Sequence, residues 1–213
     1  MSYSIGVLAK AIEEAKAKAK KRRFKQSVEL IVVLRDVDVR KPENRINMPV
    51  FLPNPPSKEA KVCVIASGDL ELKAKNSRAD LVVSRDELIK LADNKKAAKD
   101  LAKKYDFFLA QADLMPTIGR LLGRYLGPRG KMPQPVTSSM NINALVDRFK
   151  RSVRIRIKNQ PVISCRIGTE DQDSKKLAEN AMAILNAIES KFKKQNIDRI
   201  YVKLTMGPAV KVR

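Results

Sequence analysis

The 213-residue chain contains no histidine and no tryptophan, and it has only two cysteines. Without histidine it lacks the commonest metal ligand and the side chain that most often acts as a general base near neutral pH. Cys63 and Cys165 lie about a hundred residues apart, which rules out a zinc knuckle or a disulfide framework. Each stands in an apolar, strand-like run, so we expect two small buried side chains in a cytosolic protein.

Catalytic groupings are equally scarce. The acidic residues are scattered without a metal-like cluster, and no serine or cysteine has a histidine base. We therefore expect no enzyme activity, no catalytic residues, no metal and no cofactor. Long apolar runs are missing as well: none approaches the ~20 residues of a membrane-spanning helix, and the N-terminus has no apolar signal-peptide core. We expect no membrane partner.

Positive charge is what the chain has in excess, with 44 Lys and Arg against 23 Asp and Glu and a net charge of +21. Such an excess repels itself in a compact fold, so an anionic partner is expected, and nucleic acid is the leading candidate. Residues 1–25, 145–166 and 191–213 each carry a net charge of +6, whereas residues 66–113 are close to neutral. We therefore expect the two ends to form one basic domain, interrupted by a less charged insert.

Both ends of the chain show helix and antiparallel-strand patterns. Apolar residues at helical spacing predict an amphipathic helix over 5–19, and the apolar run at 28–34 predicts a strand with one buried face. Residues 153–158 alternate strictly, which predicts a strand with 161–168 as its antiparallel partner. A helix over 169–194 and a final strand with a Gly-Pro break complete the pattern of a split α/β sandwich on one sheet.

The middle of the chain differs, because short apolar strands alternate with helical segments between residues 61 and 150. This alternation predicts a parallel sheet flanked by helices. The proline-rich segment 53–58 before it cannot be a helix interior or a central strand, since proline fixes φ and removes an N–H donor. We expect this segment to be the linker out of the first domain.

A basic loop with two glycines, LGPRGKMPQP at 126–135, raises the question of a nucleotide site. A phosphate-binding P-loop needs G-x-x-x-x-G-K-S/T leading into a helix. Here Met132 stands where Ser or Thr is needed, and Tyr125 holds the earlier glycine position. The pattern is therefore missing. The alternative is an ordinary turn, with tight bends at its glycines and solvated basic side chains.

The run GRLLGRYLGPRGKMPQP at 119–135 resembles the signature of the large-subunit ribosomal protein family that builds the mobile lateral stalk, called the L-one family here. Nearly the whole chain shares the resemblance, through the segments RRFKQSVELIVVL, PENRI, DFFLAQADLMP, LAENAMAILNAI and YVKLTMGPAV, in the expected order. The lack of a long C-terminal extension is more similar to archaeal than to eukaryotic members. One departure is LPNPPSK at 52–58, where the family usually has a glycine.

The resemblance implies an α/β protein of two domains. Residues 1–57 and 153–213 would form a split β-α-β sandwich that binds RNA, and residues 58–152 an inserted Rossmann-like three-layer domain. It also implies a structural component of the large ribosomal subunit, cytoplasmic and monomeric within the ribosome. Its partners would be 23S-type ribosomal RNA at the mobile stalk, deacylated tRNA leaving the exit site, and the protein's own mRNA, whose translation it would repress.

In this family the RNA surface lies on the first domain, and the TMGP and RRFKQS motifs carry it. Thr205 would hydrogen-bond a 2′-OH or a phosphate, Met206 would pack on a sugar or base, and Gly207 would admit the RNA backbone because it has no Cβ. The basic residues of RRFKQS would meet phosphates. The RNA-binding residues expected from the resemblance are Arg22, Arg23, Phe24, Lys25, Ser27, Lys158, Asn159, Lys203, Thr205, Met206, Gly207 and Pro208.

Alternatives stay open at several positions. Phe24 would otherwise be a core aromatic, and TMGP an ordinary turn between edge strands. The basic strand face with Arg154 and Arg156 would be either solvated or in contact with RNA. Arg129 and Lys131 are candidates for a second RNA or tRNA surface.

Two rival functions also remain. A nonspecific architectural nucleic-acid-binding protein would show steep salt dependence and little preference among RNAs. A nuclease or nucleotide-using RNA enzyme would show metal- or ATP-dependent turnover.

Overall fold

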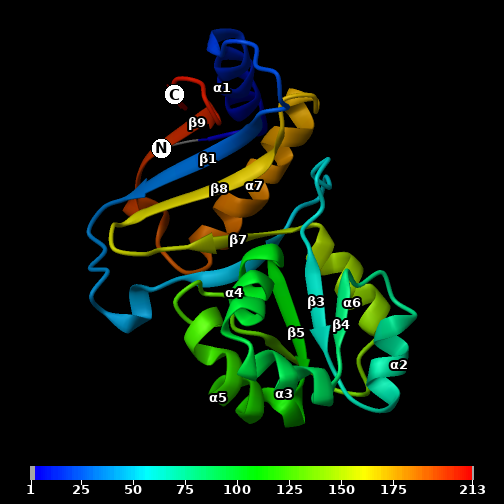
Figure 1. Ribbon diagram of the computed structural model, residues 1–213. Helices are drawn as coiled ribbons and strands as arrows, with labels where there is room; N and C mark the ends of the chain where they lie inside the picture. Colours follow the sequence, from blue (N-terminus) through cyan, green and yellow to red (C-terminus); the bar gives the residue numbers. More distant parts are fainter. Residues whose placement is uncertain (1–2, 213) are drawn as a thin grey trace. The chain divides into compact units, whose positions relative to one another are not determined.

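The structure, a computed structural model, describes residues 3–212, with the side chains of residues 92 and 93 left out. The chain forms two compact α/β units (Figure 1). The first unit combines the described residues up to Glu59 with those from Arg151 onward, and the second is inserted between them as Ala60–Lys150. The α/β fold class expected from the sequence is confirmed.

The first unit is built on a four-stranded antiparallel sheet with the strand order β10-β9-β1-β8. Its strands are β1 (Ser27–Leu34), β8 (Val162–Thr169), β9 (Ile197–Leu204) and β10 (Val210–Lys211). Helices α1 (Ile5–Lys18) and α7 (Ser174–Glu189) cover one face of this sheet (Figure 1). Because β1 lies between β8 and β9, the connection β8-α7-β9 is a split β-α-β unit.

The alternation of side chains explains this layering. Every second residue of β1 is buried, from Val28 to Leu34, and these side chains pack against apolar stripes of both helices. Leu8 of α1 and Leu177 of α7 are fully buried in these stripes, at the spacing of one helix face. The other face of the sheet keeps partly exposed side chains, so it is the face open to a partner.

A separate two-stranded antiparallel sheet pairs β2 (Asn47–Phe51) with β7 (Ser152–Arg156). The predicted pairing of 153–158 with 161–168 is therefore wrong. Pro161 has no N–H to give to β7, and its carbonyl accepts from Leu34 N at 2.8 Å. The chain after Pro161 joins β1 instead, and the loop between β7 and β8 connects two sheets.

The proline-rich segment 53–58 docks on the first unit. Asn180 of α7, which is fully buried, accepts from Asn54 N at 2.9 Å and donates from Nδ2 to Asn54 O at 2.8 Å. Gln172 Nε2 donates to Pro55 O at 2.9 Å. The expected linker is therefore fixed to its own unit before the chain enters the inserted one.

The second unit contains a parallel sheet with the strand order β4-β3-β5-β6. Its strands are β3 (Val62–Ile65), β4 (Leu81–Val83), β5 (Phe107–Gln111) and β6 (Gln134–Val136). One apolar core joins the sheet to α3 (Arg85–Asp93), α4 (Lys95–Lys104) and α5 (Met115–Leu126), and a second joins it to α2 (Asp69–Lys75) and α6 (Ile142–Lys150). Helices on both faces of a parallel sheet make the three layers of a Rossmann-like unit.

Strand β6 was not predicted, because it contains Pro135 and proline cannot donate to a sheet. The strand lies at the sheet edge, where Pro135 is paired with Ala110 of β5. An edge strand tolerates a missing N–H that a central strand would not. Short 3-10 helices occur at Pro42–Asn44, Ala112–Leu114 and Lys194–Asn196.

Both cysteines are buried in the sheets, as expected from the sequence. Cys63 lies in β3 and Cys165 in β8. Burial raises the pKa of each thiol to about 12, so both stay protonated near neutral pH. A neutral, buried thiol is neither a nucleophile nor a metal ligand.

Candidate nucleic-acid interface

The RRFKQS and TMGP motifs meet at one end of the first unit's sheet, where β1 begins and β9 ends. Thr205 N donates to Ser27 O at 3.0 Å, and Ser27 N donates to the Thr205 hydroxyl at 3.1 Å. These two residues are 178 positions apart in the sequence. The structure therefore joins two segments that the sequence indicated separately.

Gln26 ties the two motifs together from inside. Gln26 is only 1% exposed. Its side-chain Oε1 accepts a hydrogen bond from Met206 N at 3.1 Å, and its Nε2 donates one to Lys20 O at 3.1 Å. The Glu170 carboxylate accepts from Gln26 N at 3.0 Å. A buried amide whose groups are all bonded fixes the segments around it.

Sequence reasoning missed Gln26, although the residue lies inside a quoted motif. The alternation of β1 could have revealed it. Gln26 stands two residues before the buried Val28, so its side chain continues the buried face of the strand. A polar side chain at a core position needs hydrogen-bond partners, and these come from parts of the chain that the sequence does not show to be near.

Two large apolar side chains are exposed at this junction. Phe24 is 50% exposed and Met206 is 62% exposed, which excludes the alternative that Phe24 is a core aromatic. Arg22 and Arg23, next to Phe24, are exposed too. Unpaired bases and sugars pack on such apolar groups, while cations beside them meet phosphates.

Gly207 packs closely against other parts of the protein. A Cβ at this position would come within 3.2 Å of Ala19 Cβ and 3.3 Å of Leu204 Cβ. The missing side chain therefore faces the end of α1 and the end of β9. The close approach that glycine permits here is between protein segments, and the approach of RNA backbone expected from the resemblance stays a prediction. Pro208 is exposed and follows this turn.

Lys25 is held in an ion pair, with its Nζ 3.0 Å from Asp171 Oδ2. The Thr169 hydroxyl donates to the same carboxylate. The hydrogen bond from Thr169, followed by that from Lys25, lowers the pKa of Asp171 to about 2. To meet a phosphate, Lys25 has to leave this pair.

Replacing Lys25 with alanine is expected to raise the pKa of Asp171 only part of the way to its ordinary value of 3.8, because the Thr169 hydroxyl remains. A lowered carboxyl pKa stabilises the fold above the ordinary pKa, and this contribution is lost as the pH falls through about 2. NMR titration of the Asp171 carboxyl between roughly pH 1.5 and 6 measures the change. Thr169→Val should raise the pKa more than Lys25→Ala, and the opposite order would contradict the assignment.

The open face of the sheet adds residues that sequence reasoning did not single out. Glu29 of β1 stands between Arg166 of β8 and Lys203 of β9. The next row along the sheet consists of Ser164, Ile31 and Tyr201. Lys203 was expected here, but its neighbours were missed because strand alternation does not reveal which strands are adjacent. A charged row beside a row with an aromatic ring suits contact with ribose and phosphate.

Lys158 and Asn159 are exposed in the loop between β7 and β8, at the other end of the sheet. There Val33 of β1 pairs with Val162, about 20 Å from the position of Ser27 at ~3.3 Å per residue. With Arg156, the loop lines a groove of about 410 Å³. The structure does not bring this loop together with the two motifs, so one RNA reaching both must extend along the sheet.

The basic strand face on β7 is partly exposed. Arg154 and Arg156 both keep part of their surface accessible. Arg154 Nη1 donates to Asn47 Oδ1 of β2 at 3.3 Å, so this side chain is held against the neighbouring strand.

In the second unit, the loop LGPRGK ends α5. Lys131 N donates to Leu126 O at 2.9 Å, and Gly130 N donates to Gly127 O at 2.8 Å. Gly130 has a φ of 67°, which favours glycine. These paired bonds form a Schellman motif that terminates the helix, so the interpretation as a turn is confirmed.

Arg129 and Lys131 differ in their surroundings. The Lys131 ammonium donates to Ala102 O at 3.1 Å and to Tyr105 O at 2.6 Å, so it caps the C-terminal end of α4, where a cation is favourable. Lys131 is therefore bound to the protein, whereas the interpretation as an ordinary turn expected a solvated side chain; its candidacy for a second RNA or tRNA surface stays a prediction. Arg129 is exposed.

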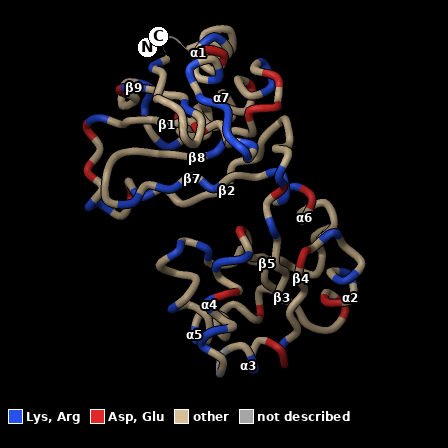
Figure 2. The backbone as a smooth tube through the Cα atoms, turned by 45° about the horizontal axis from the view of Figure 1, so that its top comes forward, with Lys and Arg blue, Asp and Glu red and all other residues tan. Residues whose placement is uncertain are grey.

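The charge pattern of the described residues fits an anionic partner. Lys and Arg recur around α1 and along β7 in the first unit (Figure 2). Within the described part of the chain, no group of three or more His, Cys, Asp or Glu could hold a metal ion. No helix in that part is long and apolar enough to cross a membrane.

The sequence model of the ribosomal protein L1p/L10e family matches residues 14–208. This match includes both motifs and the whole inserted unit. The chain belongs to the ribosomal protein L1p/L10e family. The resemblance to the L-one family is thereby confirmed, and an L1p/L10e member is a ribosomal protein of the cytoplasm and not an enzyme.

Several relatives match nearly the whole of this chain. The chain is 64% identical over 209 residues to the large ribosomal subunit protein uL1 of Thermofilum pendens, and the match covers 97% of this chain and 93% of that protein. It is 52% identical over 215 residues to the uL1 of Thermococcus kodakarensis, with coverages of 100% and 99%. For the uL1 of Aeropyrum pernix the identity is 52% over 206 residues, with coverages of 95% and 94%. These relatives are archaeal, in agreement with the archaeal character expected from the sequence.

Proposed function

We propose that this protein is a structural component of the large ribosomal subunit and binds 23S-type ribosomal RNA in the mobile stalk region through its first unit. Its relatives are named as large ribosomal subunit proteins. The observation that carries the proposal is the junction of the RRFKQS and TMGP motifs. There Ser27 and Thr205 are joined by hydrogen bonds, and the exposed side chains of Phe24 and Met206 belong to the same two motifs. Such a basic and partly apolar surface recognises RNA by its shape, sugars and phosphates.

The proposed contacts follow the three places where the expected residues lie. The motif junction supplies Arg22, Arg23, Phe24, Lys25, Ser27, Thr205, Met206, Gly207 and Pro208. Lys203 extends this surface onto the open sheet face, and Lys158 with Asn159 provides a second contact at the far end of the sheet. Arg129 of the inserted unit is proposed for a separate RNA or tRNA surface.

Two further roles belong to the same proposal. By holding the mobile stalk as a monomer, the protein would assist release of deacylated tRNA from the exit site. It would also bind a similar RNA structure in its own mRNA and so repress translation. What supports this pairing of roles is that the proposed contacts lie on one unit: if the mRNA used the same contacts, occupation by ribosomal RNA would exclude it.

A competition titration tests the proposed function. The protein is titrated with a hairpin RNA from the large-subunit stalk region, and with a scrambled RNA of equal length and composition, at about 0.15 M salt. We expect a preference for the stalk RNA on the order of 100-fold or more, because shape-specific contacts add to the charge-driven term. Equal affinities with a steep salt dependence would instead support the nonspecific architectural protein that the net charge of +21 also allows.

A further inference from the structure

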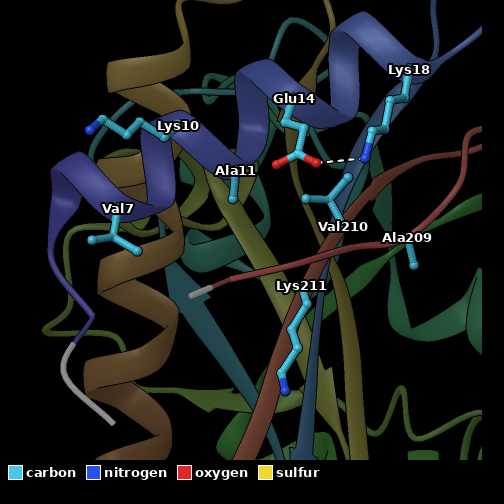
Figure 3. A pocket seen from close by; sticks show the side chains of 8 residues that line it. All are labelled: Val7, Lys10, Ala11, Glu14, Lys18, Ala209, Val210 and Lys211. Carbon is cyan, nitrogen blue, oxygen red and sulfur yellow. Dashed lines mark hydrogen bonds and ion pairs between the residues drawn. The ribbon is translucent and has the colours of Figure 1, made fainter.

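A groove of about 610 Å³ lies between α1 and the edge strand β10 of the first unit (Figure 3). Its lining residues are Val7, Lys10, Ala11, Glu14, Lys18, Ala209, Val210 and Lys211. Lys18 and Ala209 are at one end of the view, and Val7 and Lys10 are at the other (Figure 3). The groove therefore follows the length of α1.

The floor of the groove is apolar and its rim is basic. Ala11 and Val210 are 6% and 5% exposed, so they form a floor of small side chains. Lys10, Lys18 and Lys211 are exposed around it. The acidic side chain of the lining, Glu14, is occupied, because its carboxylate lies 2.6 Å from Lys18 Nζ.

One end of this groove opens at the TMGP turn. Ala209 directly follows Pro208, and Lys18 directly precedes Ala19, the residue against which Gly207 packs. A strand of RNA held at Thr205 and Met206 therefore has a continuous path into the groove. From Val7 to Lys18 the helix rises about 16 Å at 1.5 Å per residue, which is room for a few nucleotides.

We propose that the groove between α1 and β10 binds a single strand of RNA that leaves the TMGP turn, with ribose against the apolar floor and phosphates at Lys10, Lys18 and Lys211. This inference rests on the proposed function and extends its RNA surface around the edge of the sheet. Lys10, Glu14 and Lys18 follow one another at intervals of four residues on one helix face. Glu14 consequently competes with phosphate for Lys18.

The backbone of β10 argues against a peptide as the occupant. A peptide that adds a strand needs a row of free N–H and C=O groups along the edge. Strand β10 is two residues long, Pro208 before it has no N–H, and Val212 N after it donates to Ile200 O at 2.9 Å. The edge is too short for strand addition, whereas phosphates need only the exposed cations.

The test compares the wild-type protein with Lys10→Ala/Lys211→Ala, using the stalk hairpin with and without a few added nucleotides at each end. In the wild type the longer RNA is expected to bind about tenfold more tightly. The double variant should lose this gain in affinity. A plot of the logarithm of its binding constant against the logarithm of the salt concentration should also become less steep by about 1.4, because each single-strand phosphate contact contributes about 0.7. Both lysines are exposed, so the thermal midpoint should stay constant. Glu14→Gln should instead raise the affinity for the longer RNA about twofold, because it removes the ion pair between Glu14 and Lys18 and leaves Lys18 available to a phosphate.

A matched pair of lysines outside the groove serves as the control. Lys175 of α7 and Lys90 of α3 are both exposed, and Lys90→Ala/Lys175→Ala removes the same charge. An equal loss in both double variants would overturn the inference, as would a Lys10→Ala/Lys211→Ala variant that still gains from the longer RNA. Binding of a decaglutamate peptide that depends on Lys10 and Lys211, with RNA binding unchanged, would overturn it in favour of an acidic peptide. Failure of the proposed function gives a different result, namely no preference of the wild type for the stalk hairpin.

Discussion

Replacing Gln26 with methionine is expected to lower the free energy of unfolding of the first unit by about 2 kcal/mol, because the side-chain hydrogen bonds of this buried amide with Met206 N and Lys20 O are lost, at roughly 1 kcal/mol each. Met206 N loses its acceptor and Lys20 O its donor, while the methionine fills a similar volume. The turn before β10 is then held less firmly, so the affinity for stalk RNA should fall about tenfold, or ~1.4 kcal/mol. Denaturant unfolding followed through backbone NMR signals of the first unit measures the stability. Hydrogen exchange at Met206 N reports on the turn itself.

An exposed glutamine of the same unit gives the matched control. Gln160→Met changes a residue in the loop before β8 that is exposed, and surface changes of this kind stay within about 0.5 kcal/mol. If Gln26→Met were as mild as Gln160→Met, or if Met206 N kept its protection from exchange, the buried amide would not be what joins the two motifs.

The double variant Phe24→Ala/Met206→Ala is expected to lower stalk RNA affinity by about 3 kcal/mol, on the order of 100-fold, at ~1–3 kcal/mol per stacked base. Because these side chains are 50% and 62% exposed, their removal should leave stability nearly unchanged. The scrambled RNA should lose much less, since its binding depends mainly on charge. Titrations of both RNAs, together with thermal unfolding, separate the two effects.

The inserted unit offers a control with the same exposures. Ile89 is 50% exposed and Leu72 is 62% exposed, so Leu72→Ala/Ile89→Ala removes comparable apolar surface from another place. This variant should bind stalk RNA like the wild type. A similar loss in both double variants would mean that general apolar exposure, and not the motif junction, contributes the affinity.

Most elements of the fold could be predicted because their burial pattern is local. The buried register of β1 and the buried stripe of α7 are visible as periods of two and 3.6 in the sequence. The pairing of β7 with β2 could not be predicted in this way, because the two strands are about a hundred residues apart in the sequence. Pro161 redirects the chain to β1, and a sequence that alternates on both sides of a loop does not show which strand lies next to it.

The candidate site divides in the same way. Phe24, Thr205 and Met206 were found through motifs, because such residues can be read directly from the sequence. Gln26 and the row with Tyr201 depend on hydrogen bonds and strand neighbours that link the two ends of the chain. The hydrogen bonds of Lys131 could not be predicted for a related reason, since their acceptors at the end of α4 lie more than twenty residues earlier in the sequence.

The bond between Ser27 and Thr205 also sets an order of events during synthesis. The inserted unit is one continuous stretch, Ala60–Lys150, and domains fold as units while a chain emerges at ~5–20 residues per second. Strand β1 has to wait for β8 and β9, because it pairs with both, and its link to Thr205 spans 178 positions. The proposed RNA surface can therefore be assembled only after Thr205 has been synthesised and β9 is free to pair with β1. If the protein binds its own mRNA as proposed, a nascent chain that still lacks β9 cannot yet do so, and only chains synthesised past Thr205 would contribute to the repression.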